Sequence, residues 1–193
     1  VWASAATPSV TVPPSCLPVG ATTLAADRGA VAFSWHGSVY ACLAATGART
    51  KLGSATVCNV RPGRVAPVRL VGKFVAYGLA SCGVDTGSSD VVIRNLVTGK
   101  RLADLTAGTV PRLPESFVLV GSLVLKGDSA AGWIAVDESL VRTRPSSYEV
   151  HRFTGGKSFL LDSGVTIDPS SLQLVGSRMT WQDGTQTRST KLK

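Results

Sequence analysis

The sequence Val91-Val92-Ile93-Arg94-Asn95-Leu96-Val97-Thr98-Gly99-Lys100 predicts a β-strand that ends in a tight turn. β-Branched residues favour a pleated strand, and a Thr-Gly pair is typical of a turn between strands. Similar apolar runs lie at residues 68–71 and 74–79 before this stretch and at 101–105 after it, with a Gly- and Ser-rich loop at 83–89. Residues 66–107 are therefore expected to form a unit of four antiparallel strands.

The same plan recurs along the chain, because a small residue followed by an aromatic one appears four times. The aromatic residues lie 44, 56 and 48 residues apart, and a Thr-Gly turn follows each of the first three. The four steps are Val31-Ala32-Phe33, Val75-Ala76-Tyr77, Ala131-Gly132-Trp133 and Met179-Thr180-Trp181, and the turns are Thr46-Gly47, Thr98-Gly99 and Thr154-Gly155. A period of this size, made of short apolar runs and turns, is typical of β-repeats such as propeller blades.

We therefore predict an all-β fold of four blade-like antiparallel units, a small or incomplete β-propeller, with a β-sandwich as the alternative. The expected units are residues 24–56, 66–107, 117–164 and 171–193. The last is one strand short, since only residues 172–175, 178–181 and 185–191 form strand-like runs. In a closed propeller the other end of the chain can supply the missing strand, and residues 10–12 or 21–24 are the candidates.

The composition indicates a turn-rich β protein exported from a bacterial cell. The 193 residues include 20 Gly and 10 Pro, and no run reaches the ~18 apolar residues that span a bilayer. Residues 1–6 contain an Ala-x-Ala step like the cleavage end of a secretory signal, so we interpret them as a signal-peptide remnant. Residues 7–20 are expected to form an extended leader and 21–193 a single domain of a secreted or cell-surface protein.

Four cysteines, all in the first half of the chain, favour a disulfide framework. Cys16, Cys42, Cys58 and Cys82 form no Cys-x-x-Cys pair and have no His at zinc-site spacing. An even count at wide spacing favours two disulfides in an oxidising compartment. Four cysteines allow three pairings. We favour Cys16–Cys42 with Cys58–Cys82, and pairing of Cys42 with Cys58 stays open.

Residues 91–100, with their Thr-Gly-Lys turn, resemble the strand and turn of secreted bacterial propellers of the TolB-like, quinoprotein-like and WD-repeat-like groups. The Ala, Val, Gly and Arg usage is similar to that of actinobacterial proteins. The resemblance implies radial four-stranded blades with binding loops at one end of a channel. It implies no functional residue, because a fold does not fix function.

The repeated aromatic residues Phe33, Tyr77, Trp133 and Trp181 have two interpretations. Large aromatic side chains at equivalent places in successive sheets usually pack between those sheets. The alternative is a ring of exposed aromatic residues that stack on sugars. We favour packing.

The net charge is compatible with a polyanionic partner but does not predict one. The net charge is +8, but the basic residues are scattered and form no block of five or six. Aromatic residues do not interleave with them, as a nucleic-acid stacking platform requires, so no specific nucleic-acid partner is expected. The favoured interpretation is a solvated basic surface. A cell-wall polyanion binder would instead gather the basic side chains of units two to four on one face.

Two short motifs resemble catalytic or turn signatures. Gly127-Asp128-Ser129 resembles the nucleophile step of chymotrypsin-like proteases, but Ala130 and Ala131 follow it where the oxyanion hole needs glycines. Asp27-Arg28-Gly29 occupies the same place in unit one as Asp128-Ser129-Ala130 does in unit three, so a hairpin turn explains both. Residues 162–166 partly resemble the Asp-box turn of sialidase-type propellers, which is structural.

No catalytic, cofactor-binding or metal-binding residue is nominated from the sequence. The 12 acidic residues are scattered, so no pair of carboxylates for glycoside hydrolysis is evident. His36 and His151 lie far apart, and no cluster has metal-ligand spacing.

The favoured function is a secreted, non-catalytic binding or scaffold protein that recognises protein or polysaccharide through loops. Long loops on a rigid scaffold usually carry recognition, so residues 83–89 and 137–146 are the candidate surfaces. The alternative is an extracellular hydrolase or lyase that uses the propeller channel. An enzyme would show a deep pocket with convergent polar groups and a carboxylate or histidine of perturbed pKa.

Overall fold

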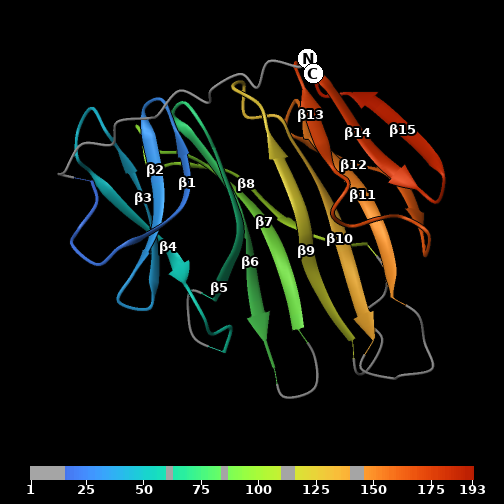
Figure 1. The fold of residues 1–193 in the computed structure, drawn as a ribbon, viewed down its shortest axis with the longest axis horizontal. Helices are drawn as coiled ribbons and strands as arrows, with labels where there is room; N and C mark the ends of the chain where they lie inside the picture. The colour runs from blue at the N-terminus through green and yellow to red at the C-terminus, as the bar shows by residue number, and fades with distance from the viewer. Residues whose placement is uncertain (1–15, 60–62, 84–86, 110–115, 140–145) are drawn as a thin grey trace, which may run out of the picture.

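A computed structural model describes residues 16–59, 63–83, 87–109, 116–139 and 146–193, and every regular element in them is a β-strand. The fifteen strands follow one another as four antiparallel meanders, which we call units one to four (Figure 1). The all-β prediction is confirmed.

Units one and two contain four strands each. Unit one consists of β1 (Thr22–Asp27), β2 (Ala30–Trp35), β3 (Ser38–Leu43) and β4 (Arg49–Ser54). Unit two consists of β5 (Arg64–Val71), β6 (Phe74–Cys82), β7 (Gly87–Asn95) and β8 (Arg101–Thr106).

Unit three repeats this plan, and unit four has three strands. Unit three consists of β9 (Ser116–Leu125), β10 (Ala131–Ser139), β11 (Ser147–Thr154) and β12 (Lys157–Gly164). Unit four consists of β13 (Gln173–Val175), β14 (Arg178–Asp183) and β15 (Gln186–Lys191). Single parallel bridges, Ser54 to Arg64 and Gly87 to Phe117, join the first three units into one 12-stranded sheet, and unit four is a separate 3-stranded sheet.

Consecutive units pack face to face, because side chains alternate between the two faces of each strand. In unit two, Val75 and Tyr77 belong to an apolar cluster shared with unit one. Their neighbours Phe74 and Ala76 belong to a cluster shared with unit three. A third cluster joins Ile134 and other residues of unit three to unit four. The core therefore consists of layers between units.

The repeated aromatic residues lie in the second strand of each unit, and the packing interpretation is confirmed. Tyr77, Trp133 and Trp181 are buried in the clusters that contact the preceding unit. Phe33 has no preceding unit and packs instead against Cys16 and Cys42. Residues 16–21 and a disulfide thus cover the face of unit one that a neighbouring unit covers elsewhere.

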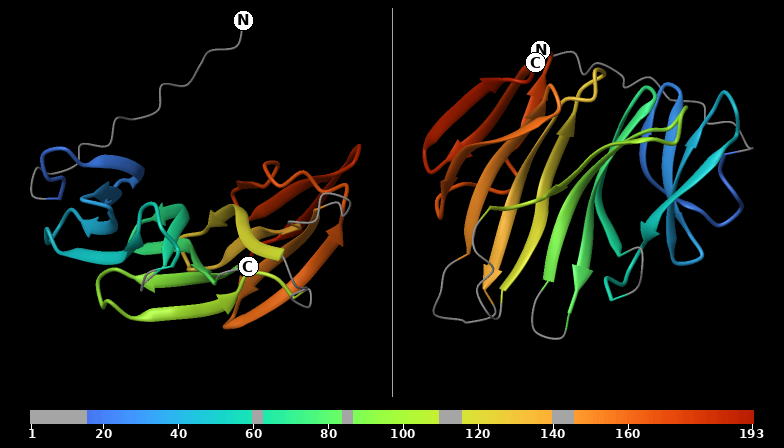
Figure 2. Two further views of the ribbon diagram at one scale, coloured as in Figure 1. Left: turned by 90° about the horizontal axis from the view of Figure 1, so that it is seen from below. Right: turned by 180° about the vertical axis from the view of Figure 1, so that it is seen from behind.

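The described units form an open array, not a closed ring, with units one and four at opposite ends of the molecule (Figures 1 and 2). The expectation that residues 21–24 complete unit four is wrong, because β1 pairs with β2 in unit one. Residues 10–12 lie outside the described residues.

The far face of unit four, which points away from unit three, is mostly polar in the described residues. Met179 and Trp181 point toward unit three, so the alternate residues face away from it. There Thr180 pairs with Ser189, and Gln182 with Thr187. Such a polar face is stable in water and unlike the apolar faces between the other units.

Candidate binding surface

One end of the array is built from tight turns, and we call it the turn end. Strands of a meander alternate in direction, so the turn between strands one and two of a unit lies at the same end as the turn between strands three and four. The Asp27 carboxylate accepts a hydrogen bond from the backbone N–H of Gly72, which joins the first turns of units one and two. A Cβ on Gly127 would lie 3.6 Å from Val71 Cγ1, which places the first turn of unit three beside them. The turn end comprises residues 28–29, 44–48, 72–73, 96–100, 126–130, 155–156, 176–177 and 192–193.

Basic side chains gather in or beside these turns. Ten of the 20 Lys and Arg residues of the chain lie there, and every unit contributes at least two. They are Arg28, Arg49, Lys73, Lys100, Arg101, Lys126, Lys157, Arg178, Lys191 and Lys193. All except Lys126 are exposed. Eight of the ten belong to units two to four, the units whose basic side chains a polyanion binder was expected to gather on one face.

Two acidic residues share the turn end, and both are held by local contacts. Asp27 is bonded to Gly72 N–H. Asp128 lies 2.7 Å from Lys126 Nζ and accepts a bond from Ala130 N–H at 3.1 Å. The hydrogen bond from Lys126 has the largest effect and lowers the pKa of Asp128; burial opposes it, and the bond from Ala130 adds to the lowering. Arg101 pairs with Asp104 further along β8.

Acidic side chains gather toward the opposite end, where the second and third strands of each unit are joined. Asp137 and Glu138 lie at the end of β10, and Asp183 lies at the end of β14. Arg188 pairs with Asp183 at 3.0 Å and with Asp162 at 3.4 Å. At the turn end, nine exposed Lys and Arg side chains stand against two acidic side chains that are already hydrogen-bonded, a balance that favours anions there.

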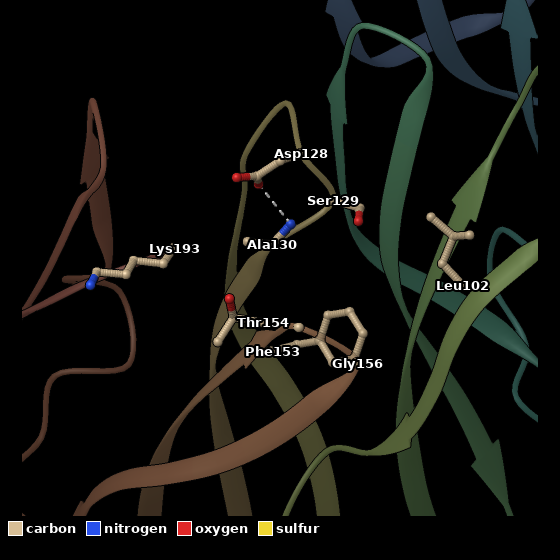
Figure 3. A pocket seen from close by; sticks show the side chains of 9 residues that line it. Leu102, Asp128, Ser129, Ala130, Phe153, Thr154, Gly156 and Lys193 are labelled. Atoms are coloured by element: carbon tan, nitrogen blue, oxygen red, sulfur yellow. Dashed lines mark hydrogen bonds between the residues drawn. The ribbon is translucent and has the colours of Figure 1, made fainter.

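A cleft of about 390 Å³ opens at the turn end between units two and three (Figure 3). Asp128, Ser129 and Ala130 stand on one side, and Phe153, Thr154 and Gly156 stand opposite them. Leu102 and Lys193 lie on the two flanks, and the Lys193 side chain is directed away from Thr154 in Figure 3. The volume is within the range of small-ligand sites. Its lining combines an apolar floor with hydroxyl, carboxylate and backbone groups.

A second hollow of about 430 Å³, which we call the inner groove, runs along the first strands of units two to four. Val124 and Leu125 at the end of β9 form its floor, since β9 packs against both β5 and β13. Residues 69–71 of β5 form one wall, and residues 172–175, which include β13, form the other. The groove therefore ends beside the first turns of three units.

A buried ionisable pair lies away from the turn end, between units two and three. Glu149 and His151 stand two residues apart on β11, so both face the same side. His151 Nε2 is 2.8 Å from Glu149 Oε2, and Trp133 stacks on the imidazole with ring centroids 5.1 Å apart. The Glu149 carboxylate also accepts bonds from Thr109 N–H at 2.6 Å and Thr109 Oγ1 at 2.8 Å.

The environment lowers the pKa of both groups. For His151, burial disfavours the charged imidazolium and outweighs the opposing effect of Glu149. For Glu149, burial raises the pKa, but the hydrogen bonds from Thr109 and His151 together outweigh it. The adjoining cavity, lined by Asp137 and Glu149, holds about 10 Å³, which is room for about one water molecule and not for a substrate. The pair therefore fastens residues 107–109 to unit three.

The cysteines pair as Cys16–Cys42 and Cys58–Cys82, with Cα atoms 5.6 Å and 5.1 Å apart. The favoured pairing is therefore confirmed, and the alternative Cys42–Cys58 is wrong. Cys82 N–H also donates to Cys58 O at 3.1 Å. The second disulfide thus fastens the link between units one and two to the end of β6.

The other short motifs are structural. Asp128, Ser129 and Ala130 lie in the turn between β9 and β10, and Arg28 and Gly29 form the turn between β1 and β2 directly after Asp27, so both predicted hairpin turns are confirmed. In the Asp-box-like stretch, Asp162 accepts a bond from Trp181 Nε1 at 2.8 Å. Thr166 Oγ1 donates to Asp183 at 2.6 Å. These two bonds join units three and four.

Neither predicted recognition loop is described in full, and the two histidines lie apart from each other. Residues 84–86 and 140–145 of the two loops lie outside the described residues, and the strands that flank them meet at the end opposite the turn end. His36 is exposed in the turn between β2 and β3, whereas His151 is buried in unit three. Among the described residues, no three His, Cys, Asp or Glu side chains gather to hold a metal ion. No helix in the described ranges is long and apolar enough to cross a membrane.

Sequence reasoning missed two features. Glu149-Val150-His151 has the alternation that places two ionisable groups on one face of a strand, but nothing in the sequence shows that this face is covered by Thr109. A Lys or Arg in or just after nearly every short turn was a visible signal of the basic end. The sequence analysis interpreted these Lys and Arg residues as scattered, because their positions are far apart along the chain.

Comparison with known proteins identifies no family for this chain. No protein-family model matches the sequence, and no curated protein matches it. Among solved structures, the chain is similar to the Kuenenia stuttgartiensis hydrazine synthase, with 13% identity and a TM-score of 0.48. The similarity covers 88% of this chain and 51% of that chain, so this chain spans about half the length of that structure. A likeness at this level carries no argument about function.

Proposed function

We propose that the protein is a secreted, non-catalytic binding module for an anionic polysaccharide, which it contacts through the turn end. The observation that carries this proposal is the repetition of basic residues in or beside the turns of all four units. We further infer that the units are blades of an open, incomplete β-propeller, because they are meanders stacked face to face.

The spacing of the cations suits a long polymer. Stacked sheets lie about 10 Å apart, so equivalent turns present a cation at roughly that interval. A rigid row of charges loses little entropy when a polymer with regularly repeated anionic groups binds along it. Several weak contacts on one chain then add to a useful affinity.

The side chains that lie between the basic residues favour a sugar polymer over a nucleic acid as the ligand. The turns supply hydroxyl groups from Thr98, Ser129, Thr154 and Ser177, which match sugar hydroxyls. The cleft beside Asp128 has the size and the mixed lining for one sugar unit. Nucleic-acid binding without sequence preference uses a series of exposed aromatic rings between the cations. Near this end Trp133 and Phe153 are buried, and among the large apolar side chains that are exposed Phe159 is the one aromatic ring in the described residues.

The two disulfides support an extracellular location. They persist in oxidising compartments and are rare in the cytosol. They also brace the first two units, which suits a rigid scaffold.

The test is equilibrium binding measured by fluorescence anisotropy with three labelled chains of equal length. We expect polyglucuronate to bind with an affinity that falls steeply as salt is raised, because exposed charges are screened. Uncharged dextran should not bind, and single-stranded DNA should bind more weakly than polyglucuronate. Equal binding of dextran and polyglucuronate, or preferential binding of DNA, would contradict the proposal.

A further inference from the structure

We propose that the cleft between units two and three binds one N-acetylated sugar of the anionic polysaccharide, and that Ser129 is a specificity-determining residue of this site. The inference rests on the proposed function, because the sugar in the cleft belongs to the polymer that the turn end contacts. It adds a neutral, selective contact to the charged ones.

The apolar part of the cleft fits a methyl group better than a stacked sugar ring. Leu102, Ala130 and Phe153 form this part. Phe153 is only 6% exposed, so its ring has no open face on which a sugar could stack. Leu102 is 38% exposed and stands across the cleft from Ser129 (Figure 3). The methyl of an N-acetyl group would leave water against these side chains, which favours binding.

The polar part of the cleft supplies partners for the rest of an N-acetyl group, which carries one N–H donor and one carbonyl acceptor. The Asp128 carboxylate is exposed and has about four acceptor positions. Lys126 Nζ and Ala130 N–H occupy two of them, so the carboxylate can also accept from the sugar N–H. The hydroxyls of Ser129 and Thr154 on the cleft walls can donate to the sugar carbonyl.

The charges indicate that the sugar in the cleft is not itself the anionic one. A uronate carboxylate there would be repelled by Asp128, which is ionised at neutral pH because its pKa is lowered. Lys193 is exposed on the flank and is directed away from Thr154 (Figure 3). Lys157 directly follows Gly156 and is also exposed. These two lysines suit carboxylates on the neighbouring sugars of the same chain.

Ser129 has a backbone conformation that glycine would adopt more easily. Its φ is 72°, and among the described residues His36 is the other non-glycine residue with a positive φ. The turn holds this conformation, since Ser129 N–H donates to Lys126 O at 3.0 Å and Lys126 N–H donates to Ala130 O at 2.8 Å. A strained residue on the wall of a cleft suggests a functional side chain. Here that side chain is a hydroxyl.

The test uses two uncharged monosaccharides, methyl N-acetylglucosaminide and methyl glucoside, titrated into the protein and followed by the NMR shifts of its backbone amides. Uncharged sugars report on the cleft without the cations. We expect the acetylated sugar to bind at least about tenfold more tightly. The shifts should centre on Ser129, Thr154 and Gly155.

Ser129→Gly separates a binding role from a structural one. It removes the hydroxyl and relieves the backbone, so the melting temperature should stay equal or rise. Affinity for the acetylated sugar should nevertheless fall roughly threefold to tenfold. Unchanged affinity would show that Ser129 sets no specificity.

A matched pair of leucine variants locates the methyl site. Leu102→Ser should weaken binding of the acetylated sugar roughly fivefold, because it removes apolar surface from the cleft. Leu160→Ser is the control, since Leu160 is 48% exposed on β12 and does not line the cleft. It should bind as the unmodified protein does.

Three further results would overturn the inference. Equal binding of methyl glucoside would show that the N-acetyl group is not recognised. Equal losses in Leu102→Ser and Leu160→Ser would place the sugar elsewhere. Absence of binding by the acetylated sugar while polyglucuronate still binds would refute the cleft site and leave the proposed function standing. Failure of polyglucuronate to bind while the acetylated sugar binds would refute only the proposed function.

Discussion

The carboxylate of Asp27 accepts a hydrogen bond from the backbone N–H of Gly72, a residue 45 positions further along the chain. This bond joins equivalent turns of units one and two. It also places one of the two acidic residues of the turn end where it fixes backbone geometry. The repeat in the sequence therefore corresponds to equivalent turns that lie side by side. The basic residues of those turns are brought to the same end of the molecule.

Two substitutions separate the structural and electrostatic effects of Asp27. Asp27→Ala removes both the bond and the charge, so it should lower the free energy of unfolding by about 1 kcal/mol and strengthen polyglucuronate binding. Asp27→Asn keeps an acceptor for Gly72 and should strengthen binding with less loss of stability. Urea denaturation and anisotropy measure the two quantities. Weaker binding by Asp27→Asn would contradict the electrostatic account.

The disulfides should contribute strongly to stability. They close loops with sequence separations of 26 and 24 residues, for which chain entropy alone gives about 3.5 kcal/mol each. Cys58→Ser/Cys82→Ser should therefore lower the melting temperature by roughly 10 °C. The Cys16 pair also covers Phe33, so its removal should expose that face to the dye ANS. An unchanged melting temperature under reducing conditions would contradict this assignment.

Stability should decrease on acidification in two stages. The folded state holds the pKa of His151 below its ordinary 6.5, so the unfolded chain binds the proton more readily, and stability falls as the pH drops below 6.5. The pKa of Glu149 lies below its ordinary 4.5, so a second loss begins below pH 4.5.

Matched histidine variants test the first stage. His151→Asn should remove most of the change in unfolding free energy between pH 7 and pH 5, which we expect to be on the order of 1 kcal/mol. His36→Asn, at an exposed position with a φ of 45°, should keep it. Asn tolerates that backbone conformation. If both variants keep the full pH dependence, His151 is not its source.

The packing of unit three on unit four leaves no space at Gly132. A Cβ there would lie 2.0 Å from the sulfur of Met179, a side chain with no exposed surface into which it could move. Gly132→Ala should therefore cost about 1–3 kcal/mol of stability. Gly29→Ala, where nothing lies within 4 Å, should cost less than about 0.5 kcal/mol. Equal effects of the two substitutions in urea denaturation would contradict the described interface.

Local sequence signals predicted the strands and turns, and long-range packing explains what they missed. The alternation around Tyr77 and the Thr98-Gly99 turn correctly indicated unit two, because hairpins form between neighbouring segments. The sequence did not decide between a closed ring and an open array, because the polar far face of β14 is recognised only once the strands on either side of it are known. The Glu149–His151 pair was missed for the same reason, since Thr109 reaches it from another unit.

The most direct test of the central claim compares two double variants that remove equal charge from different places. Lys100→Gln/Lys157→Gln changes the turn end, whereas Lys51→Gln/Arg188→Gln changes β4 and β15 away from it. All four side chains are exposed, so both proteins should fold. The measurement is the Kd for polyglucuronate at about 0.15 M salt, where the screening length is about 8 Å. We expect the first variant to bind roughly 10- to 30-fold more weakly and the second to bind within about twofold of the unmodified protein. Equal weakening in both would show that only net charge matters, and it would contradict the assignment of the turn end as the binding surface.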